Sequence, residues 1–202
     1  LKLKSVRSLC CEGLSAIHGH QLINTAHLRY LDLSRSKIVS LPDSLCTLHN
    51  LQSLWLNGCS RLRYLPDCMS AMRKISYIHL LECDSLERMP PKLGRLQNLR
   101  TLTTFIVDTA DGLGIEELRD LRHLGNRLEL FNLSKVKDDG SEAANLHEKR
   151  NLSELVLYWG RDRDYDPLDN EACDEDEGVL ESLVPHGELK VLKLHGYGGL
   201  AV

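Results

Sequence analysis

Apolar residues recur in one fixed frame along the chain between positions 28 and 102. Each occurrence has apolar residues at its first and fourth positions, most also at the sixth, and the occurrences begin at Leu28, Leu51, Ile75 and Leu99. The spacings are therefore 23, 24 and 24 residues. A unit this short cannot bury a core of its own, so neighbouring units must stack and share one continuous core. The pattern predicts a solenoid.

The frame L-x-x-L-x-L with a period of about 20 to 29 residues is typical of leucine-rich repeats. In the second unit, Leu54 and Leu56 alternate with Ser53, Trp55 and Asn57. This two-residue period indicates a strand with one buried and one solvent-facing side. We therefore expect an α/β solenoid: a leucine-rich-repeat horseshoe with a parallel concave sheet and short helices or turns on the convex side.

Three of the units return through a Leu-Pro or Met-Pro step. Proline has a fixed φ and no N–H, which suits the start of a short helix or turn. Apolar residues follow three and six positions later, as Leu45 and Leu48 follow Pro42. Cys59 and Cys83 lie eight residues after their frames begin, where this class of repeat has a small side chain that reaches backbone groups of the turn.

The repeat pattern is less regular outside residues 28–102. Residues 1–27 contain a degraded first unit, and an irregular stretch at about 105–150 lacks the Leu-Pro step. Apolar residues recur every third position from Ile115 to Leu124, which predicts a longer helix in place of the short turn. The frame returns at Leu152. We expect the whole chain, residues 1–202, to be a single repeat domain and a fragment of a longer protein.

The segment 161–177 is strongly acidic. It carries nine Asp and Glu against two Arg and has no apolar period. Such a composition buries too little apolar surface to offset the entropy of ordering, so we expect a mobile loop inserted in a return path. Val179, Leu180 and Leu183 then predict a helix.

The reactive side chains form no catalytic or metal-binding pattern. The seven cysteines include no C-x-x-C spacing, which argues against a zinc site and a closed disulfide framework, and free thiols fit a reducing compartment. No nucleophile, base and orienting group can be aligned, and no G-x-x-x-x-G-K-[ST] run occurs. No segment approaches 18 consecutive apolar residues. We expect a module that is not an enzyme and has no metal, cofactor, membrane span or nucleic-acid partner.

Three stretches carry a resemblance to a known family: E-A-A-N-L-H-E-K-R at 142–150, L-V-P-H at 183–186 and G-Y-G-G at 196–199. Together with the Leu-Pro returns, they resemble the leucine-rich-repeat domain of plant intracellular nucleotide-binding disease-resistance proteins of the coiled-coil type. The resemblance implies a cytoplasmic or nuclear module that senses a pathogen effector or a guarded host protein. It also implies that the module helps to hold an upstream nucleotide-binding domain inactive. One alternative is a constitutive leucine-rich-repeat scaffold for intracellular signalling proteins, and another is an adaptor fused to a catalytic domain.

The strand alternation also assigns candidate binding residues to the concave face. Tyr and Trp give a large contact area at a small cost in entropy, so they are enriched in interface hot spots. The candidate partner-binding residues are Tyr30, Asp32, Trp55, Asn57, Tyr77, His79, Tyr158 and Lys193. The alternative is that the aromatic residues serve only the β-propensity of a solvated strand.

Charge is distributed unevenly along the chain. Residues 1–100 carry 14 Lys and Arg against seven Asp and Glu, whereas residues 101–202 carry 11 against 22. A stack holds its ends apart, so this asymmetry persists in space and orients partners of opposite charge. In the resembled receptors the N-terminal repeats abut the nucleotide-binding domain, so we expect a basic patch that docks an acidic surface there. Its residues are Arg29, Arg35, Arg61, Arg63 and Arg73. The alternative is a solvated basic flank without a partner.

Overall fold

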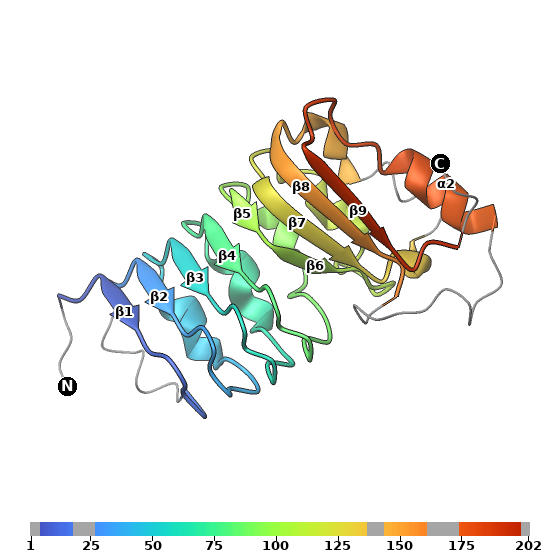
Figure 1. Cartoon of the computed structure of the whole chain (residues 1–202). Helices are drawn as coiled ribbons and strands as arrows, with labels where there is room; N and C mark the ends of the chain where they lie inside the picture. Colours follow the sequence, from blue (N-terminus) through green and yellow to red (C-terminus); the bar gives the residue numbers. More distant parts are fainter. Residues whose placement is uncertain (1–4, 18–26, 137–143, 161–173, 199–202) are drawn as a thin grey trace.

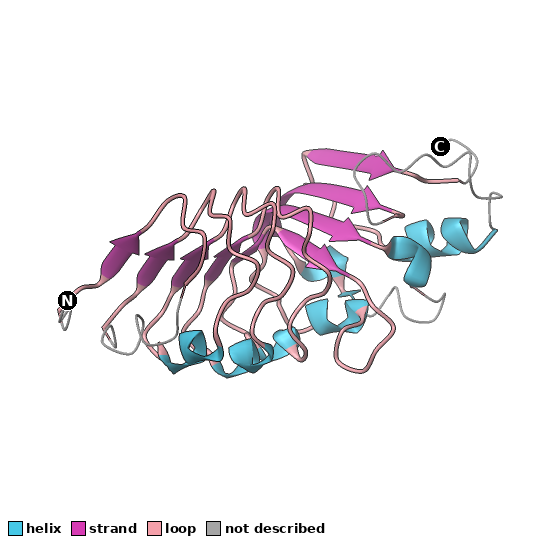
Figure 2. Ribbon diagram, turned by 90° about the horizontal axis from the view of Figure 1, so that it is seen from below, coloured by secondary structure: helices cyan, strands magenta, loops and turns pink. Residues whose placement is uncertain are grey.

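The computed structural model describes residues 5–17, 27–136, 144–160 and 174–198. Its strands line one side of the molecule and its short helical turns the other (Figure 1 and Figure 2). The strands are β1 (Ser8–Cys10), β2 (Tyr30–Asp32), β3 (Ser53–Trp55), β4 (Tyr77–His79), β5 (Thr101–Leu102), β6 (Thr104–Ile106), β7 (Gly125–Phe131), β8 (Asn151–Tyr158) and β9 (Val191–His195). All pairs of neighbouring strands are parallel. The predicted leucine-rich-repeat solenoid is confirmed.

The strands form two sheets that meet in one segment of chain. The first sheet has the order β1-β2-β3-β4-β5 and the second β6-β7-β8-β9. Only Thr103 separates β5 from β6. The Thr103 N–H donates to the carbonyl oxygen of Ile78 in β4, the strand next to β5 (3.3 Å). The Thr103 carbonyl oxygen accepts from the N–H of Glu129 in β7 (2.9 Å). Strand pairing therefore passes from one sheet to the other at this residue.

The apolar residues of the frame stack into one shared core. Leu31, Leu54 and Ile78 are register partners in neighbouring strands, and each is at most 1% exposed. Leu9 of β1 pairs with Leu31, so the weakened first unit is present. In this arrangement each unit is stabilised mainly by its neighbours.

The small residues of the turn slot connect neighbouring units. The thiol of Cys59 donates to the carbonyl oxygen of Leu33, and the thiol of Cys83 donates to that of Leu56, each at 3.2 Å. Both carbonyls belong to the preceding unit and are buried from water, where an unpaired group would be destabilising. The role predicted for this slot is confirmed.

The described return paths between β2 and β8 contain short 3₁₀ helices. They are η1 (Asp43–Thr47), η2 (Asp67–Ala71), η3 (Leu93–Arg95), η4 (Ile115–Leu118), η5 (Leu133–Lys135) and η7 (Leu146–Glu148). η1 and η2 begin directly after Pro42 and Pro66, as the Leu-Pro steps predict. Leu45 and Leu48 are at most 1% exposed, so one such turn does bury both apolar residues.

The longer helix predicted from Ile115 to Leu124 is wrong. η4 ends at Leu118, and the following residues form turns. The apolar residues at positions 115, 118, 121 and 124 are nevertheless at most 3% exposed. A strict spacing of three fits the 3₁₀ period, in which residues i and i+3 eclipse, better than the 3.6-residue period of an α-helix. The apolar face was predicted correctly, but the type of helix was not.

Lys149 occupies a core slot that other units fill with an apolar side chain. Its equivalents are Leu48, Met72, Leu96 and Leu121. Lys149 is 0% exposed, and its Nζ donates to the carbonyl oxygens of Leu118 (2.8 Å) and Leu121 (3.4 Å). Burial lowers the pKa of Lys149 to about 8, against the opposing effect of Glu148 and Asp120. The core of this unit therefore contains a lysine amine at a position where the repeat pattern predicts an apolar side chain.

The acidic segment is partly helical rather than a loop throughout. Helix α2 spans Asp174–Ser182, so the last four residues of the predicted loop at 161–177 belong to it, while residues 161–173 lie outside the described part. Negative charge near a helix N-terminus interacts favourably with the exposed N–H groups there. Val179 and Leu183 are 2% and 1% exposed, so the predicted apolar face of this helix does pack on the core.

The expectation that the cysteines are free thiols is wrong for one pair. Cys46 in η1 and Cys68 in η2 form a disulfide, with their Cα atoms 6.1 Å apart. They are 22 residues apart in the chain and become neighbours only because consecutive units stack. No local spacing such as C-x-x-C could have indicated this pair. The other described cysteines are the free thiols Cys10, Cys11, Cys59 and Cys83.

Candidate protein-recognition surface

Aromatic side chains gather on the concave face of the first sheet. Leu54 of β3 points into the core, so the alternation of the strand turns Ser53 and Trp55 to the opposite side. Strand register then places Asp32, Trp55 and His79 in one row across three strands. We call the following residues the concave cluster: Tyr30, Asp32, Trp55, Tyr77 and His79.

Three rings of the concave cluster, those of Tyr30, Trp55 and His79, contact one another. The Trp55 and His79 rings stack with centroids 3.8 Å apart and an interplanar angle of 22°, and the Tyr30 ring lies 6.2 Å from Trp55 in a tilted arrangement. The indole Nε1 of Trp55 donates to Ser53 Oγ at 2.8 Å. Because these contacts fix the rings before any partner arrives, little side-chain entropy remains to be lost on binding.

The concave cluster has a defined charge state. Burial lowers the pKa of His79, with Asp32 partly opposing the shift, so the imidazole is neutral at neutral pH. Burial and the Asp32 carboxylate raise the pKa of Tyr30, so its phenol stays protonated. Asp32 accepts hydrogen bonds from the Ser34 N–H (2.9 Å) and the Tyr30 hydroxyl (3.4 Å). The cluster thus presents neutral rings beside one carboxylate.

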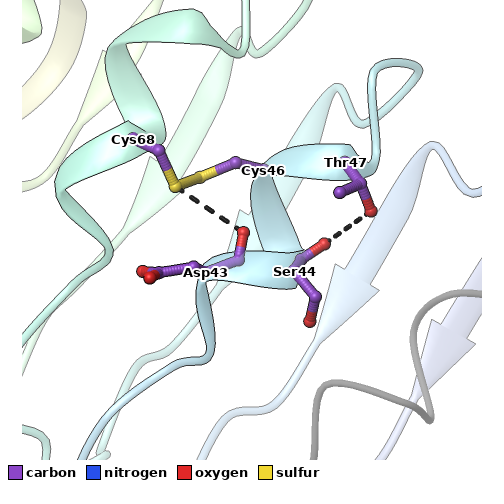
Figure 3. The surroundings of a disulfide bond; sticks show 5 residues. All are labelled: Asp43, Ser44, Cys46, Thr47 and Cys68. Atoms are coloured by element: carbon purple, nitrogen blue, oxygen red, sulfur yellow. Dashed lines mark hydrogen bonds between the residues drawn. A yellow bond between two sulfur atoms is a disulfide. The ribbon is translucent and has the colours of Figure 1, made fainter.

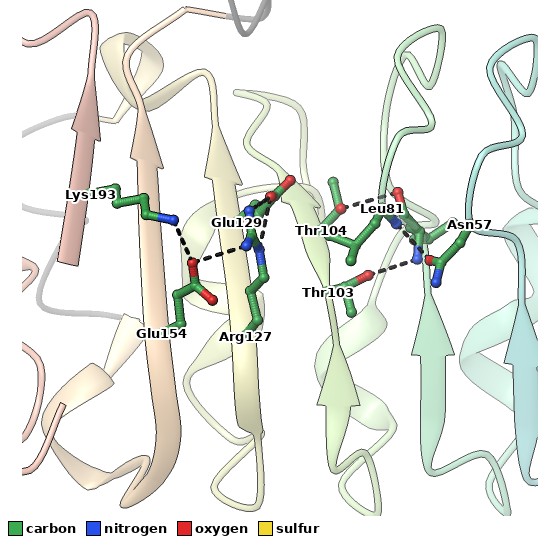
Figure 4. A network of polar contacts seen from close by, with 9 residues as sticks. Asn57, Leu81, Thr103, Thr104, Arg127, Glu129, Glu154 and Lys193 are labelled. Carbon is green, nitrogen blue, oxygen red and sulfur yellow. Dashed lines mark hydrogen bonds and ion pairs between the residues drawn. The ribbon is translucent and has the colours of Figure 1, made fainter. Parts of the chain in front are cut away.

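Tyr77 of the concave cluster and the further predicted binding residue Asn57 differ in their surroundings. Tyr77 is 37% exposed and lies at the solvent-facing side of β4. The side-chain oxygen of Asn57 accepts the N–H of Leu81 at 2.9 Å, which joins this unit to the next (Figure 4). Asn57 therefore has a structural contact, in addition to the partner contact that stays a prediction.

The second sheet carries an ion-pair network on the same face. Arg127 in β7 bonds Glu129 at 2.5 Å and Glu154 in β8 at 2.9 Å, and Lys193 in β9 bonds Glu154 at 2.9 Å (Figure 4). Glu129 is 0% exposed. The Lys193 hydrogen bond and the Arg127 charge lower the pKa of Glu154. The sequence places Glu154 and Lys193 on the concave face by strand alternation, and Lys193 was predicted as a binding residue. The network with Arg127 and Glu129 was missed, although the polar position of Glu129 between Leu128 and Leu130 was an available signal.

The predicted binding residue Tyr158 is largely covered. Its ring stacks on Phe131 at 4.3 Å and on His195 at 4.5 Å, so both faces of the ring are occupied. Tyr158 is only 5% exposed. The expectation of an accessible side chain is wrong here, because three aromatic residues in adjacent strands pack against one another. Lys193, by contrast, is exposed.

The five arginines of the predicted basic patch do not gather in one place. Arg29 and Arg73 precede strands, whereas Arg35, Arg61 and Arg63 follow them. In a parallel sheet, residues before and after the strands lie at opposite edges. Arg63 is also bonded to Glu87 and lies over the ring of Tyr64, with its Cζ 5.3 Å from the centroid. The structure divides the set between two edges, and docking to an acidic surface stays a prediction.

The described residues contain no group of three or more His, Cys, Asp or Glu arranged to bind a metal ion. No helix in the same part of the chain is long and apolar enough to cross a membrane.

Comparison with known proteins gives the class of this chain. Residues 3–62 match the family described as leucine rich repeat, and residues 115–202 match the family of R13L1/DRL21 leucine-rich repeats. The leucine-rich-repeat domain of the type III effector XopL has a similar structure, with a TM-score of 0.53 and 18% identity over 95% of this chain and 70% of that one. The chain is a leucine-rich-repeat protein.

Similar plant proteins show which group of leucine-rich-repeat proteins this chain belongs to. RGA1 and RGA4 of Solanum bulbocastanum, both named as disease resistance proteins, are each 38% identical to it. The alignments cover 94% and 85% of this chain but only 21% and 19% of the two relatives. This chain belongs to the leucine-rich-repeat regions of plant disease-resistance proteins, and it spans about a fifth of the length of these relatives.

Proposed function

We propose that this chain is the protein-recognition module of a plant immune receptor. It senses a pathogen effector, or a host protein that the receptor guards, through its concave face. It also helps to hold an upstream nucleotide-binding domain inactive until that contact is made. The observation that carries the proposal is the concave cluster, where Trp55 and His79 stack on the strand face rather than in the core.

The properties of the concave cluster suit a binding surface. Trp55 and His79 are each partly exposed, and their rings are already ordered. Tyr77 adds a more exposed ring one strand away from Trp55, at the end of β4 nearest to Ser53. Hot spots of interfaces are rich in Trp and Tyr because these rings desolvate a large area with few rotatable bonds.

The ionic network of the second sheet supports a role in specificity. Arg127 and Lys193 together balance Glu129 and Glu154, so these four side chains have no net charge as a group. A partner that offers its own charges must match this fixed pattern or leave groups unpaired, which is unfavourable.

A segment exchange tests the proposal. This chain replaces the corresponding segment of full-length RGA1, and leaf tissue is scored for cell death with and without the pathogen. We expect a pathogen-dependent response that Trp55→Ala abolishes. Gln52→Ala, an exposed residue just before β3, is the matched control and should leave the response intact.

The same experiment addresses the restraint of the upstream domain. Reversal of Arg29 and Arg73 to Glu, at the sheet edge before the strands, should cause cell death without pathogen if this edge holds that domain. Charge contacts of this kind weaken with salt and need several residues. Equal signalling with and without pathogen in the unsubstituted chimera would contradict the proposal and favour a constitutive scaffold.

A further inference from the structure

Cys46 and Cys68 face each other across two neighbouring turns of the convex side. η1 carries Cys46 and η2 carries Cys68, and their Sγ atoms are bonded (Figure 3). The Cα atoms are 6.1 Å apart, within the usual range for a disulfide. The backbone of two stacked units therefore already presents the two sulfurs to each other.

The stacking of units explains this position. Leu45 and Met69 are equivalent buried residues of η1 and η2. Cys46 follows the first and Cys68 precedes the second, so the two cysteines are offset toward each other across the gap between the units. Both are half-buried at the convex surface, whereas Leu45 and Met69 are 0% exposed.

The other described cysteines have different environments. Cys59 and Cys83 are buried in the core, and their thiols donate to backbone carbonyls of the preceding unit. Burial raises the pKa of the Cys59 thiol, which disfavours the reactive thiolate. Cys10 and Cys11 are adjacent in the weak first unit. Among the described cysteines, Cys46 and Cys68 are the ones that combine a facing partner with access from solvent.

Cys68 also lines a surface groove together with Tyr64, Pro66 and Arg88. The groove leaves solvent-accessible space beside Cys68 in which a small thiol or disulfide can approach. In addition, Cys68 Sγ lies 3.6 Å from the carbonyl oxygen of Asp43 (Figure 3). In the reduced form the Cys68 thiol can donate to this oxygen, so reduction leaves the sulfur close to its position.

The disulfide closes a loop of the chain that contains β3 of the concave face. Residues 46–68 form the ring that the disulfide closes, and this ring contains β3 with Trp55. Closing a loop of this length restricts the unfolded chain and suppresses local opening of the unit. The Cys46–Cys68 disulfide on the convex side therefore helps to keep β3, with Trp55, ordered on the concave side.

We propose that Cys46 and Cys68 form a reversible redox modification site that takes a low-molecular-weight thiol–disulfide couple. On oxidation, one thiolate attacks the disulfide RSSR and releases RSH after protonation. The second thiolate then attacks the mixed disulfide, forms the Cys46–Cys68 bond and releases a second RSH. Two cysteine thiols are oxidised while one RSSR is reduced to two RSH, and reduction of the protein reverses both steps.

Thiol trapping in glutathione buffers tests the site. The 202-residue chain is equilibrated with mixtures of reduced and oxidised glutathione, alkylated and analysed by peptide mass spectrometry. We expect Cys46 and Cys68 to lose alkylation together in oxidising buffer and to regain it in reducing buffer. Cys59 and Cys83 should stay alkylatable after denaturation throughout. Alkylation of both Cys46 and Cys68 in the most oxidising buffer, or a bond from either to another cysteine, would overturn the proposal.

Hydrogen exchange and unfolding test the link to β3. Reduction should raise the equilibrium constant for unfolding by about 100-fold and speed exchange of the amides within residues 46–68. The variants Cys46→Ser and Cys68→Ser should behave like the reduced protein in either buffer. Cys10→Ser, which removes an exposed free thiol, is the control and should retain the redox response. If the protein showed the same exchange in residues 46–68 in both buffers despite a formed bond, the bond would not be a switch of this unit.

Discussion

The Nζ of Lys149 lies 2.8 Å from the carbonyl oxygen of Leu118, in a core slot where other units have Leu or Met. Leu118 is the last residue of η4 in the preceding unit. The lysine therefore joins two units by a hydrogen bond at the C-terminal end of a helical turn, where a positive charge is favourable. The side chain is 0% exposed, so this bond is made at the expense of hydration.

This contact makes the stability of the chain depend on pH. Burial lowers the pKa of Lys149 from 10.5 to about 8 in the folded protein. The unfolded chain therefore binds more protons than the folded one between these two pH values, and stability rises with pH across this window. We expect the free energy of unfolding in urea to increase by up to about 3 kcal/mol between pH 8 and 10.5. Lys149→Met should remove this increase, and an unchanged rise in that variant would assign it to other groups.

Arg127 should contribute more to stability than its neighbour Lys193. Arg127→Ala removes the guanidinium that pairs with the fully buried Glu129, and losing one partner of a buried pair costs about 3 kcal/mol or more. Lys193→Ala removes an exposed contact to Glu154, for which we expect a loss of about 1 kcal/mol or less. Urea midpoints of the two variants compare these values. Equal losses would mean that the buried carboxylate does not depend on Arg127.

Backbone strain recurs at one slot of the repeat. Arg35, Gly58 and Glu82 are equivalent turn residues with φ of 58°, 72° and 60°, and only one of them is glycine. Glu82→Gly should stabilise the fold by about 0.5 to 1 kcal/mol, because glycine adopts this conformation without strain.

The reverse change at the same slot provides the comparison. A Cβ at position 58 would lie 3.3 Å from Arg35 Cγ in addition to the positive φ. Gly58→Ala should therefore destabilise the protein by about 1 to 2 kcal/mol. Thermal unfolding of both variants measures the two effects. A stabilising Gly58→Ala would rule out strain at this slot.

Leu54 should be critical for the stability of the fold, because neighbouring units share one core. Leu54 is 0% exposed between Leu31 and Ile78 of the neighbouring strands. Leu54→Asp should lower stability by about 4 kcal/mol or more, because it buries an unpaired charge. Gln52→Asp, two residues earlier on the surface, should change it by about 0.5 kcal/mol or less. Similar circular dichroism melts for the two variants would contradict this core.

Several features of this protein follow from the sequence alone because they are periodic. The positions of Leu31, Leu54 and Ile78 in the core result from a pattern that each unit repeats. That Cys59 and Cys83 reach backbone groups also follows from the slot that these residues occupy, although stacking decides that the groups belong to the preceding unit. The exposure of the Trp55 face follows from strand alternation beside a buried leucine. In each case, near neighbours in the chain carry the information.

Other features were decided only by the tertiary structure, because they depend on residues that stacking brings together. The Cys46–Cys68 bond joins positions 22 residues apart, and Lys149 reaches a carbonyl 31 residues earlier in the chain. The ring of Tyr158 is covered by Phe131 and His195 from the two adjacent strands. Periodicity predicts which side of a strand a residue faces. Which side chains meet depends on the offset between neighbouring units, and that offset exists only once the units have packed.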